Sequence, residues 1–260
     1  MTKSSANAWP PSTNPCNAAP APDSVGIVIP VRDGMKFFKL CFHSILSFTD
    51  HPYTITVVDN QSGKEMRDYL FWSLRKNHKI DVVRWTDEFN FAAQVNLGLR
   101  RAFLNPNVRY GLILNADTVV EPLWLSTLME TMKLSSRTGA IGPISNKAQP
   151  EQEGERVAKI EAVGRLSGFC MLIRREMFEQ LNGFDEAYKG GCYEDWDFSM
   201  RARAAMWNLV VDRRVHIHHF WRMFRYQEGG AGRAHFKENE ARYFARYPHL
   251  RSCVVEEKTA

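Results

Sequence analysis

Side chains that can bind metals or move protons gather at four places along this chain. They are Asp59, the pair Asn115 and Asp117, the cluster Glu194, Asp195 and Asp197, and the triplet His216, His218 and His219. Carboxylates and imidazoles serve as metal ligands and as general acids and bases, so each group is a candidate functional site. Each also has a structural interpretation, because Asp and Asn favour turns and acidic residues suit the first turn of a helix.

The pair Asn115 and Asp117 follows an apolar run at residues 111–114. A short run of this kind is typical of a buried parallel strand, and open α/β sheets bind ligands just beyond the carboxyl ends of such strands. Asp117 is therefore predicted to lie where a metal or a phosphate binds. The alternative is that both residues only shape the turn and cap a helix that begins near Pro122.

The elements needed to position these groups alternate along the first half of the chain. Apolar patterns predict strands at 25–31, 54–58, 80–85 and 110–114, and helices at 36–48, 65–75, 91–103 and 123–134. Such alternation indicates an α/β fold with an open, mostly parallel sheet and helices on both faces.

The rhythm changes after Ala140, where residues 145–165 are polar and 149–154 read as a mobile loop. Beyond it the pattern predicts strands at 168–174, 209–212 and 215–217, and helices at 175–181, 193–207 and 233–247. We expect a disordered leader at 1–23, one domain at 24–250 and a tail at 251–260. Within the domain, 24–140 is the expected nucleotide-binding half, and 141–250 the acceptor half with a basic C-terminal segment.

The cysteines and the hydropathy of the chain indicate the cellular compartment of the protein. Five cysteines, an odd number without a Cys-x-x-Cys motif, indicate reduced thiols rather than a disulfide framework or a zinc ribbon. No apolar run approaches the roughly 20 residues that span a bilayer, and the N-terminus lacks the apolar core of a signal peptide. These features predict a cytoplasmic protein.

Positive charge is concentrated near the C-terminus. The chain carries a net charge of +5, whereas residues 201–251 alone hold 11 Lys and Arg against 4 Asp and Glu. This basic segment is either a solvated face, a nucleic-acid patch, or a surface for the inner face of an anionic membrane or a phosphorylated, lipid-linked acceptor. No nucleic-acid partner is expected, because no RNP, zinc-finger or helix-turn-helix pattern accompanies the charge.

The order of several short motifs is more specific than any one of them. They are Val28-Ile29-Pro30-Val31, Val57-Val58-Asp59-Asn60-Gln61-Ser62, the stretch from Asn90 to Gly98, Leu114-Asn115-Ala116-Asp117, the stretch from Ile141 to Asn146, the stretch from Gly168 to Ile173, Gly183-Phe184-Asp185-Glu186, Tyr193-Glu194-Asp195-Trp196-Asp197 and His218. From about Ser24 to about Pro248 the chain resembles the family 2 glycosyltransferases, inverting enzymes of the GT-A fold.

The resemblance implies an enzyme that moves a sugar from a nucleoside-diphosphate sugar to an acceptor hydroxyl in polysaccharide or glycoconjugate synthesis. Asp117 and His218 would hold Mn²⁺ or Mg²⁺, which offsets charge on the diphosphate. Asp59 would accept a hydrogen bond from the nucleobase. The remaining residues implied at the nucleotide pocket are Pro30, Asn90, Asn96 and Asn115.

The resemblance also implies that Asp195 is the general base, with Glu194 binding or orienting the acceptor. A helix N-terminus is expected to keep Asp195 ionised. One displacement with one base and no protein nucleophile implies inversion.

Three positions depart from the family pattern or leave it ambiguous. Asn115 replaces the first Asp of the Asp-x-Asp motif, and Arg32-Asp33 stands where Tyr-Asn is frequent. Strand alternation places His216 and His218 on one face and His219 beyond the strand, so the imidazole ligand is ambiguous. Two rival functions stay open, namely a domain that binds a nucleotide sugar without turnover and a nucleic-acid-binding protein that uses the basic segment.

Overall fold

The protein is described by a computed structural model that covers residues 22–74, 79–221 and 231–251. The expected leader and tail lie outside these ranges, apart from residues 22, 23 and 251. The first strand of the described chain begins at Ser24.

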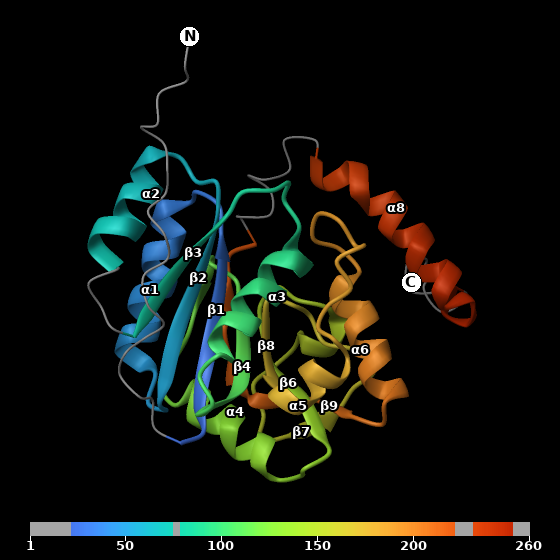
Figure 1. The fold of residues 1–260 in the computed structure, drawn as a ribbon. Coiled ribbons are helices and arrows are strands. Elements are labelled where there is room, and N and C mark those ends of the chain that lie inside the picture. Colours follow the sequence, from blue (N-terminus) through green and yellow to red (C-terminus); the bar gives the residue numbers. More distant parts are fainter. Residues whose placement is uncertain (1–21, 75–78, 222–230, 252–260) are drawn as a thin grey trace.

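A mixed sheet runs through the centre of the described chain (Figure 1). Its strands are β1 (Ser24–Val31), β2 (Tyr53–Asn60), β3 (Ile80–Trp85), β4 (Val108–Leu114), β6 (Thr138–Ile144), β7 (Ile160–Ala162), β8 (Cys170–Arg174) and β9 (Asn208–His216). They are hydrogen-bonded in the order β3-β2-β1-β4-β8-β6-β9-β7. The strands β3, β2, β1 and β4 are parallel, which confirms the predicted α/β class.

Helices cover both faces of the sheet (Figure 1). They are α1 (Met35–Phe48), α2 (Lys64–Tyr69), α3 (Phe91–Ala102), α4 (Trp124–Lys133), α5 (Arg175–Gln180), α6 (Glu194–Ala204) and α8 (Ala231–Arg246), with shorter helical turns at Leu70–Leu74 (η1), Pro150–Gln152 (η2) and Pro248–Leu250 (η3). One apolar cluster joins α1, α2 and α4 to the sheet, and a second joins α3, α5 and α6 to it.

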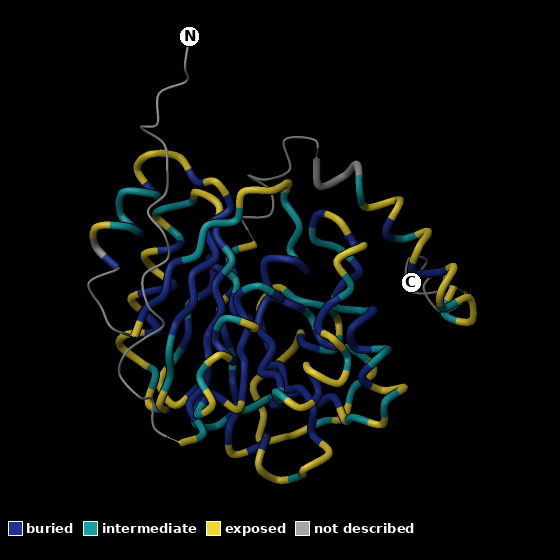
Figure 2. Tube along the Cα trace, viewed as in Figure 1, coloured by how far each residue is buried: buried dark blue, intermediate teal, exposed yellow. Residues whose placement is uncertain are grey.

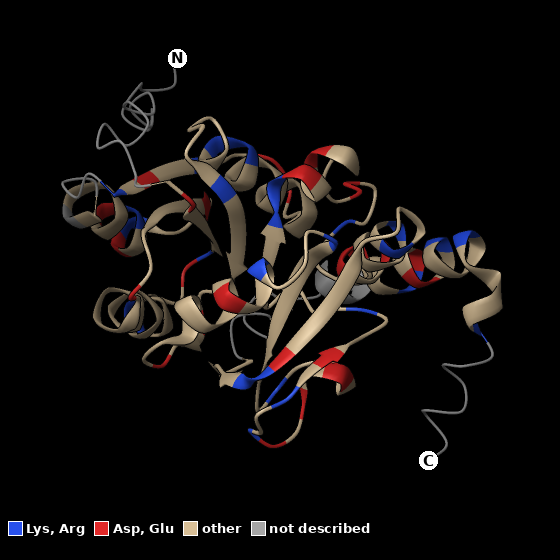
Figure 3. Ribbon diagram, turned by 90° about the horizontal axis from the view of Figure 1, so that it is seen from below, with Lys and Arg blue, Asp and Glu red and all other residues tan. Residues whose placement is uncertain are grey.

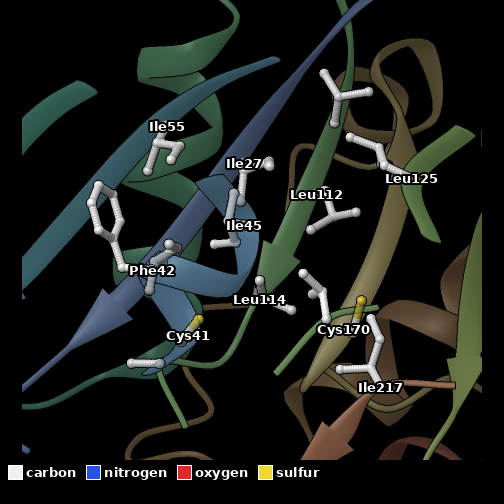
Figure 4. Packing of buried hydrophobic residues seen from close by; sticks show 14 of the residues in the cluster. Ile27, Cys41, Phe42, Ile45, Ile55, Leu112, Leu114, Leu125, Cys170 and Ile217 are labelled. Carbon is white, nitrogen blue, oxygen red and sulfur yellow. The ribbon is translucent and has the colours of Figure 1, made fainter. Parts of the chain in front are cut away.

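The buried strands form the core between these two helical layers (Figure 2). In the first layer Ile45 of α1 lies among Ile27, Leu112 and Leu114 of the central strands (Figure 4). In the second layer Gly98 allows α3 to approach the sheet closely, because a Cβ at this position would lie 2.2 Å from Cγ1 of Val28. This approach lets α3 pack closely on β1 and β2.

Several elements differ from the sequence prediction. The stretch after Ala140 continues a strand, β6, and β8 lies antiparallel between β4 and β6. The two short strands expected at 209–212 and 215–217 are one strand, β9. The expected mobile loop at 149–154 contains η2, in which Gln152 is fully buried.

The C-terminal helix α8 lies against α6, away from the sheet (Figure 1). An aromatic cluster of Tyr188, Tyr193, Tyr243 and Phe244 fills the contact between the two helices. Asp197 of α6, which is fully buried, also accepts a hydrogen bond from the Tyr247 hydroxyl at 3.0 Å.

The arginines of the basic segment are largely engaged within the fold. Arg201 and Arg246 pair with Asp197, Arg213 pairs with Glu161, and Arg214 pairs with Asp212. Arg222 and Arg225, and the side chain of Arg233, lie outside the described residues. Figure 3 shows acidic and basic residues interspersed along the ribbon. The described part of the segment therefore holds both paired arginines and exposed basic side chains, the latter at Arg203, Lys237, Arg242 and Arg251. None of the described helices has the length and hydropathy needed to cross a membrane.

The ion pair of Asp212 predicts a large stability effect. Asp212 is fully buried, and its carboxylate accepts hydrogen bonds from Thr131 Oγ1 at 2.7 Å and from the Arg214 guanidinium at 2.8 and 3.0 Å. Asp212→Ala leaves the Thr131 hydroxyl and the partly exposed Arg214 guanidinium without this acceptor, so it should lower the free energy of unfolding by about 1–3 kcal/mol in urea titrations. The control is Asp68→Ala, which breaks the exposed pair with Lys64 and should change stability little. Equal losses in the two variants would contradict the prediction.

Candidate active site

The loops that follow β1 and β2 are fastened to each other at the carboxyl edge of the sheet. The Asp33 backbone N–H donates to Ser62 Oγ at 2.8 Å, and the Gly63 N–H donates to Asp33 Oδ1 at 2.7 Å. Pro30 lies half-buried near the end of β1, opposite Val58 in the register of β2. Asp33, which departs from the family pattern, therefore shapes this edge.

Asp59 lies at the end of β2 with its carboxylate fully buried. It accepts a hydrogen bond from the Ser62 N–H at 3.2 Å and pairs with the Arg84 guanidinium. Arg84 was not identified from the sequence. The parallel register of β2 and β3 places Arg84 opposite Asp59, so the pairing of these two strands would have identified it.

Asn90 and Asn96 fasten α3 to the loop at residues 183–186. Asn90 caps α3 by accepting from the Ala93 N–H at 3.1 Å, and its amide donates to the Glu186 carbonyl at 2.8 Å. Asn96 is fully buried and bonds both the N–H and the carbonyl of Phe184, at 2.8 and 2.9 Å. Asn96 therefore joins α3 to this loop through a buried amide.

The turn that carries Asn115 and Asp117 is held from three sides. The Asn115 N–H donates to the Phe169 carbonyl at 2.8 Å, and the Phe220 N–H donates to the Asp117 carbonyl at 2.9 Å. From α1, Ser44 Oγ accepts from the Val120 N–H at 3.1 Å. These bonds fix the direction of the Asp117 side chain, which is 2% exposed.

A thiol beneath the same turn adds a weaker contact. Cys41 Sγ lies 3.6 Å from the Asn115 carbonyl oxygen and 3.5 Å from Thr118 Oγ1. Burial raises the pKa of Cys41 to about 12, so the group stays a protonated donor. Figure 4 shows Cys41 among the apolar side chains of this layer.

His219, rather than His218, lies beside Asp117. The Nε2 atom of His219 is 3.3 Å from Asp117 Oδ1, and Asn115 Nδ2 is 3.4 Å from the same nitrogen. His218 is exposed and packs edge-on against Phe220. The Nδ1 atom of His216 lies 3.3 Å from Glu121 Oε1.

The resemblance implied His218 as the imidazole ligand, whereas the structure brings His219 to Asp117. The strand β9 ends at His216, and a separate strand, β10 (His218–His219), pairs antiparallel with β5 (Thr118–Val119). In that register His219 stands opposite Thr118, next to Asp117. His218 is exposed in this strand, while His219 is buried beside the turn that carries Asp117.

The donor set formed by His219 and Asp117 fits a divalent cation. His219 Nδ1 lies 2.9 Å from the Lys147 carbonyl, which only accepts, so the Nδ1 hydrogen is donated there. In the neutral imidazole Nε2 then carries a lone pair that faces a carboxylate oxygen. Among the described residues no group of three His, Cys, Asp or Glu side chains forms, so a cation would take further ligands from a substrate or water.

Glu194 and Asp195 begin α6, and burial governs both carboxyl groups. Glu194 is 4% exposed, and its Oε2 has no hydrogen-bond partner among the described residues. Burial raises its pKa well above the usual glutamate value, and the neighbouring Asp195 charge adds to this. Asp195 accepts hydrogen bonds from the N–H groups of Gly168 and Trp196, both at 2.9 Å.

Burial also acts on the pKa of Asp195, at the N-terminus of α6. Burial raises it above the usual aspartate value, while the two backbone hydrogen bonds and the positive charge of Arg165 oppose this rise. A raised pKa makes the carboxylate a stronger base.

The buried Glu194 carboxyl predicts that stability depends on pH. Its pKa is higher in the folded chain, so between the two values the folded chain binds more protons, and the unfolding free energy falls as pH rises. That window opens at the ordinary value of 4.5 and extends upward. Glu194→Gln removes the titrating group. In urea titrations, the unfolding free energy should therefore fall less between about pH 5 and about pH 8 in this variant than in the parent. An identical fall in the variant and the parent would show that folding does not raise the pKa of Glu194.

Gln152 is a supporting residue that the sequence did not reveal. Its amide donates to the Pro143 carbonyl at 2.9 Å and accepts from the Ser167 N–H at 2.6 Å. It thereby ties the end of β6 to the segment that reaches Asp195. A single buried Gln in a polar stretch carries no sequence signal for this role.

The parallel strands β1, β2 and β4, with carboxylates at their carboxyl ends and an acidic helix start nearby, define a ligand-binding α/β domain. A protein-family model, glycosyl transferase family 2, matches residues 26–209. That range covers more than half of the chain, and the chain belongs to this family.

The chain is also similar to a curated protein of larger size. The O-antigen biosynthesis protein RfbC of Myxococcus xanthus is 22% identical over 226 residues, which cover 75% of this chain and 17% of RfbC. The chain spans 24% or less of the length of the curated relatives it matches.

Two solved structures share the fold. The mannosyltransferase PcManGT of Pyrobaculum calidifontis, solved with GDP-Man and Mn²⁺, has a TM-score of 0.65 at 18% identity, covering 88% of this chain and 66% of PcManGT. TarS 1-349 of S. aureus, solved with UDP-GlcNAc, has a TM-score of 0.59 at 14% identity, covering 75% of this chain and 58% of that one. The fold is that of the GT-A glycosyltransferases.

Proposed function

We propose that this chain transfers a sugar from a nucleoside-diphosphate sugar to an acceptor hydroxyl, with inversion at the anomeric carbon. One observation carries the proposal. Two consecutive residues, Gly168 and Phe169, contact the groups needed for both halves of the reaction. Gly168 donates to the Asp195 carboxylate at 2.9 Å, while Phe169 bonds Asn115 and stacks on His219 with ring centroids 5.1 Å apart. The candidate base and the candidate metal ligands are thus fixed relative to each other.

On the donor side, Asp117 and His219 would hold a divalent cation, with Asn115 beside them. When bound, the cation would neutralise charge on the leaving diphosphate. Asp59 and the half-buried Pro30 would lie at the nucleobase, and Arg84 would fix the direction of the Asp59 carboxylate. The structures solved with GDP-Man, UDP-GlcNAc and Mn²⁺ support a donor of this class.

On the acceptor side, Asp195 would take the proton of the attacking hydroxyl. The acceptor oxygen then bonds to the anomeric carbon as the bond to the phosphate oxygen breaks, and the nucleoside diphosphate leaves with the electron pair. No protein nucleophile takes part, so the configuration inverts. The buried Glu194 would orient Asp195 rather than meet the acceptor directly.

The name of one relative supports a class of acceptor. RfbC is named for O-antigen biosynthesis, which supports a glycan or glycolipid acceptor in polysaccharide or glycoconjugate synthesis. A nucleic-acid function has less support, because described arginines of the basic segment pair with acidic residues of the fold.

Release of the nucleoside diphosphate tests the activity. In separate reactions, the protein and Mn²⁺ are incubated with UDP-glucose, with UDP-GlcNAc or with GDP-mannose. Water is the acceptor in each reaction. We expect release from at least one donor above the protein-free rate, and none with Asp117→Ala. Binding of these donors without release would favour the rival function, a domain that binds a nucleotide sugar without turnover.

A further inference from the structure

The side chain of Asn146, just after β6, holds the backbone of His219 by two hydrogen bonds. The His219 N–H donates to Asn146 Oδ1 at 2.8 Å, and Asn146 Nδ2 donates to the His219 carbonyl at 3.2 Å. The N–H only donates and the carbonyl only accepts, so both bonds agree on the orientation of the amide. The amide of Asn146 thus pairs with His219 as the backbone of a neighbouring strand would.

This pairing supports a very short ladder. The strands β10 and β5 have two residues each and form a two-stranded sheet, which is a marginally stable arrangement by itself. The Phe220 N–H donates to the Asp117 carbonyl of the turn before β5, so the N–H of the preceding residue, His219, faces the other side. Asn146 accepts that N–H and therefore holds the free edge of β10.

The residue next to Asn146 holds the imidazole ring of the same histidine. The Lys147 carbonyl lies 2.9 Å from His219 Nδ1, and the Phe169 ring stacks on the imidazole at an interplanar angle of 14°. In the neutral ring the hydrogen is then on Nδ1, and the lone pair is on Nε2, which lies 3.3 Å from Asp117 Oδ1. Residues 146 and 147 therefore fix both the backbone and the ring of His219.

The segment that carries these two residues is anchored by Ser145, which is 2% exposed. The Ser145 N–H donates to the Gln152 carbonyl at 2.8 Å, and its hydroxyl donates to Asn146 Oδ1 and accepts from the Lys147 N–H, both at 3.3 Å. The Asn146 side chain itself is exposed, so its truncation removes no core packing. An effect on His219 can thus be separated from unfolding.

We propose that Asn146 is a positioning residue for the pair formed by Asp117 and His219. By holding the His219 backbone, it keeps ring Nδ1 against the Lys147 carbonyl and leaves the Nε2 lone pair toward the carboxylate. The inference rests on the proposed function for its meaning at a metal site, because groups that orient an imidazole ligand tune metal affinity. The orientation of the ring is testable without metal.

Long-range ¹H–¹⁵N NMR of the metal-free protein shows which ring nitrogen of His219 carries the hydrogen, and His219→Ala identifies the signals by removing them. At about pH 8 we expect the hydrogen on Nδ1 in the parent, and a large part of it on Nε2 in Asn146→Ala, because the Lys147 carbonyl is no longer held against the ring. The control is Asn208→Ala, which truncates an exposed asparagine at the start of β9 and should leave the signals unchanged.

A double-mutant cycle measures the effect on the metal site. UDP and GDP are titrated with Mn²⁺ into the parent, N146A, H219A and the double variant. N146A should lower the Mn²⁺-supported affinity about fivefold to tenfold in the parent, and it should have no further effect once His219 is replaced. With EDTA in place of Mn²⁺, N146A and the parent should bind nucleotide equally, because Asn146 acts through the metal ligand.

The proposal is overturned if the parent ring carries its hydrogen on Nε2, or if N146A leaves the hydrogen where the parent has it. It is also overturned if N146A lowers nucleotide affinity equally with and without His219, or equally in Mn²⁺ and in EDTA. If neither N146A nor Asn146→Ser folds, Asn146 is a packing residue and the proposal fails. If the hydrogen moves in N146A but the parent binds neither nucleotide with Mn²⁺, the positioning of His219 stands and the proposed metal site is rejected.

Discussion

Replacing Asp195 with Asn is expected to lower turnover by a factor on the order of 100 or more while the affinity for the donor stays close to that of the parent. Asparagine keeps the shape of the side chain but has no basicity. One of the two N–H donors at this carboxylate, Gly168 or Trp196, would also lose its acceptor. Initial rates of nucleoside diphosphate release, with binding measured separately, check the expectation.

The matched control is Asp185→Asn, which neutralises a carboxylate in the loop before α6. Asp185 pairs with Arg246 and is partly exposed, so its removal should leave turnover near the parent value. If D195N retains near-parent turnover, Asp195 is a helix-terminal carboxylate and the base is another residue.

Replacing His219 with Ala is expected to weaken Mn²⁺-supported binding of nucleoside diphosphate by about tenfold or more. His219 Nε2 faces Asp117 Oδ1 at 3.3 Å, so the alanine variant removes one of the two proposed protein ligands. Isothermal titration of UDP and GDP in the presence of Mn²⁺ measures the loss.

His218→Ala is the control for this prediction. The side chain is exposed and belongs to the same short strand, so the variant should bind nucleotide as the parent does. A silent H219A together with an impaired H218A would restore the ligand assignment first expected from the sequence.

The sheet and its helices could be predicted from the sequence because their apolar patterns are local. The strands that became β1, β2, β3 and β4 carry continuous apolar runs, and the helices between them carry one apolar face. The antiparallel insertion of β8 could not be predicted, because strand direction depends on contacts between residues far apart in the chain.

The sequence could locate several candidate site residues at the ends of elements, but not how these residues lie relative to one another. The motif around Asp117 and the start of α6 lie at element ends that periodicity locates. The position of His219 beside Asp117 depends on the pairing of β10 with β5, and the burial of Glu194 depends on how α6 docks. Pairings such as Arg84 with Asp59 follow from strand register, which one sequence does not reveal.

Titration of UDP and GDP into the parent protein, first with Mn²⁺ and then with EDTA, tests most directly whether Asp117 and His219 form a metal-assisted nucleotide site. We predict that at least one of the two nucleotides binds with Mn²⁺, and that its affinity falls about tenfold or more when EDTA removes the metal. Binding of neither nucleotide, or equal affinity with and without metal, would contradict the account.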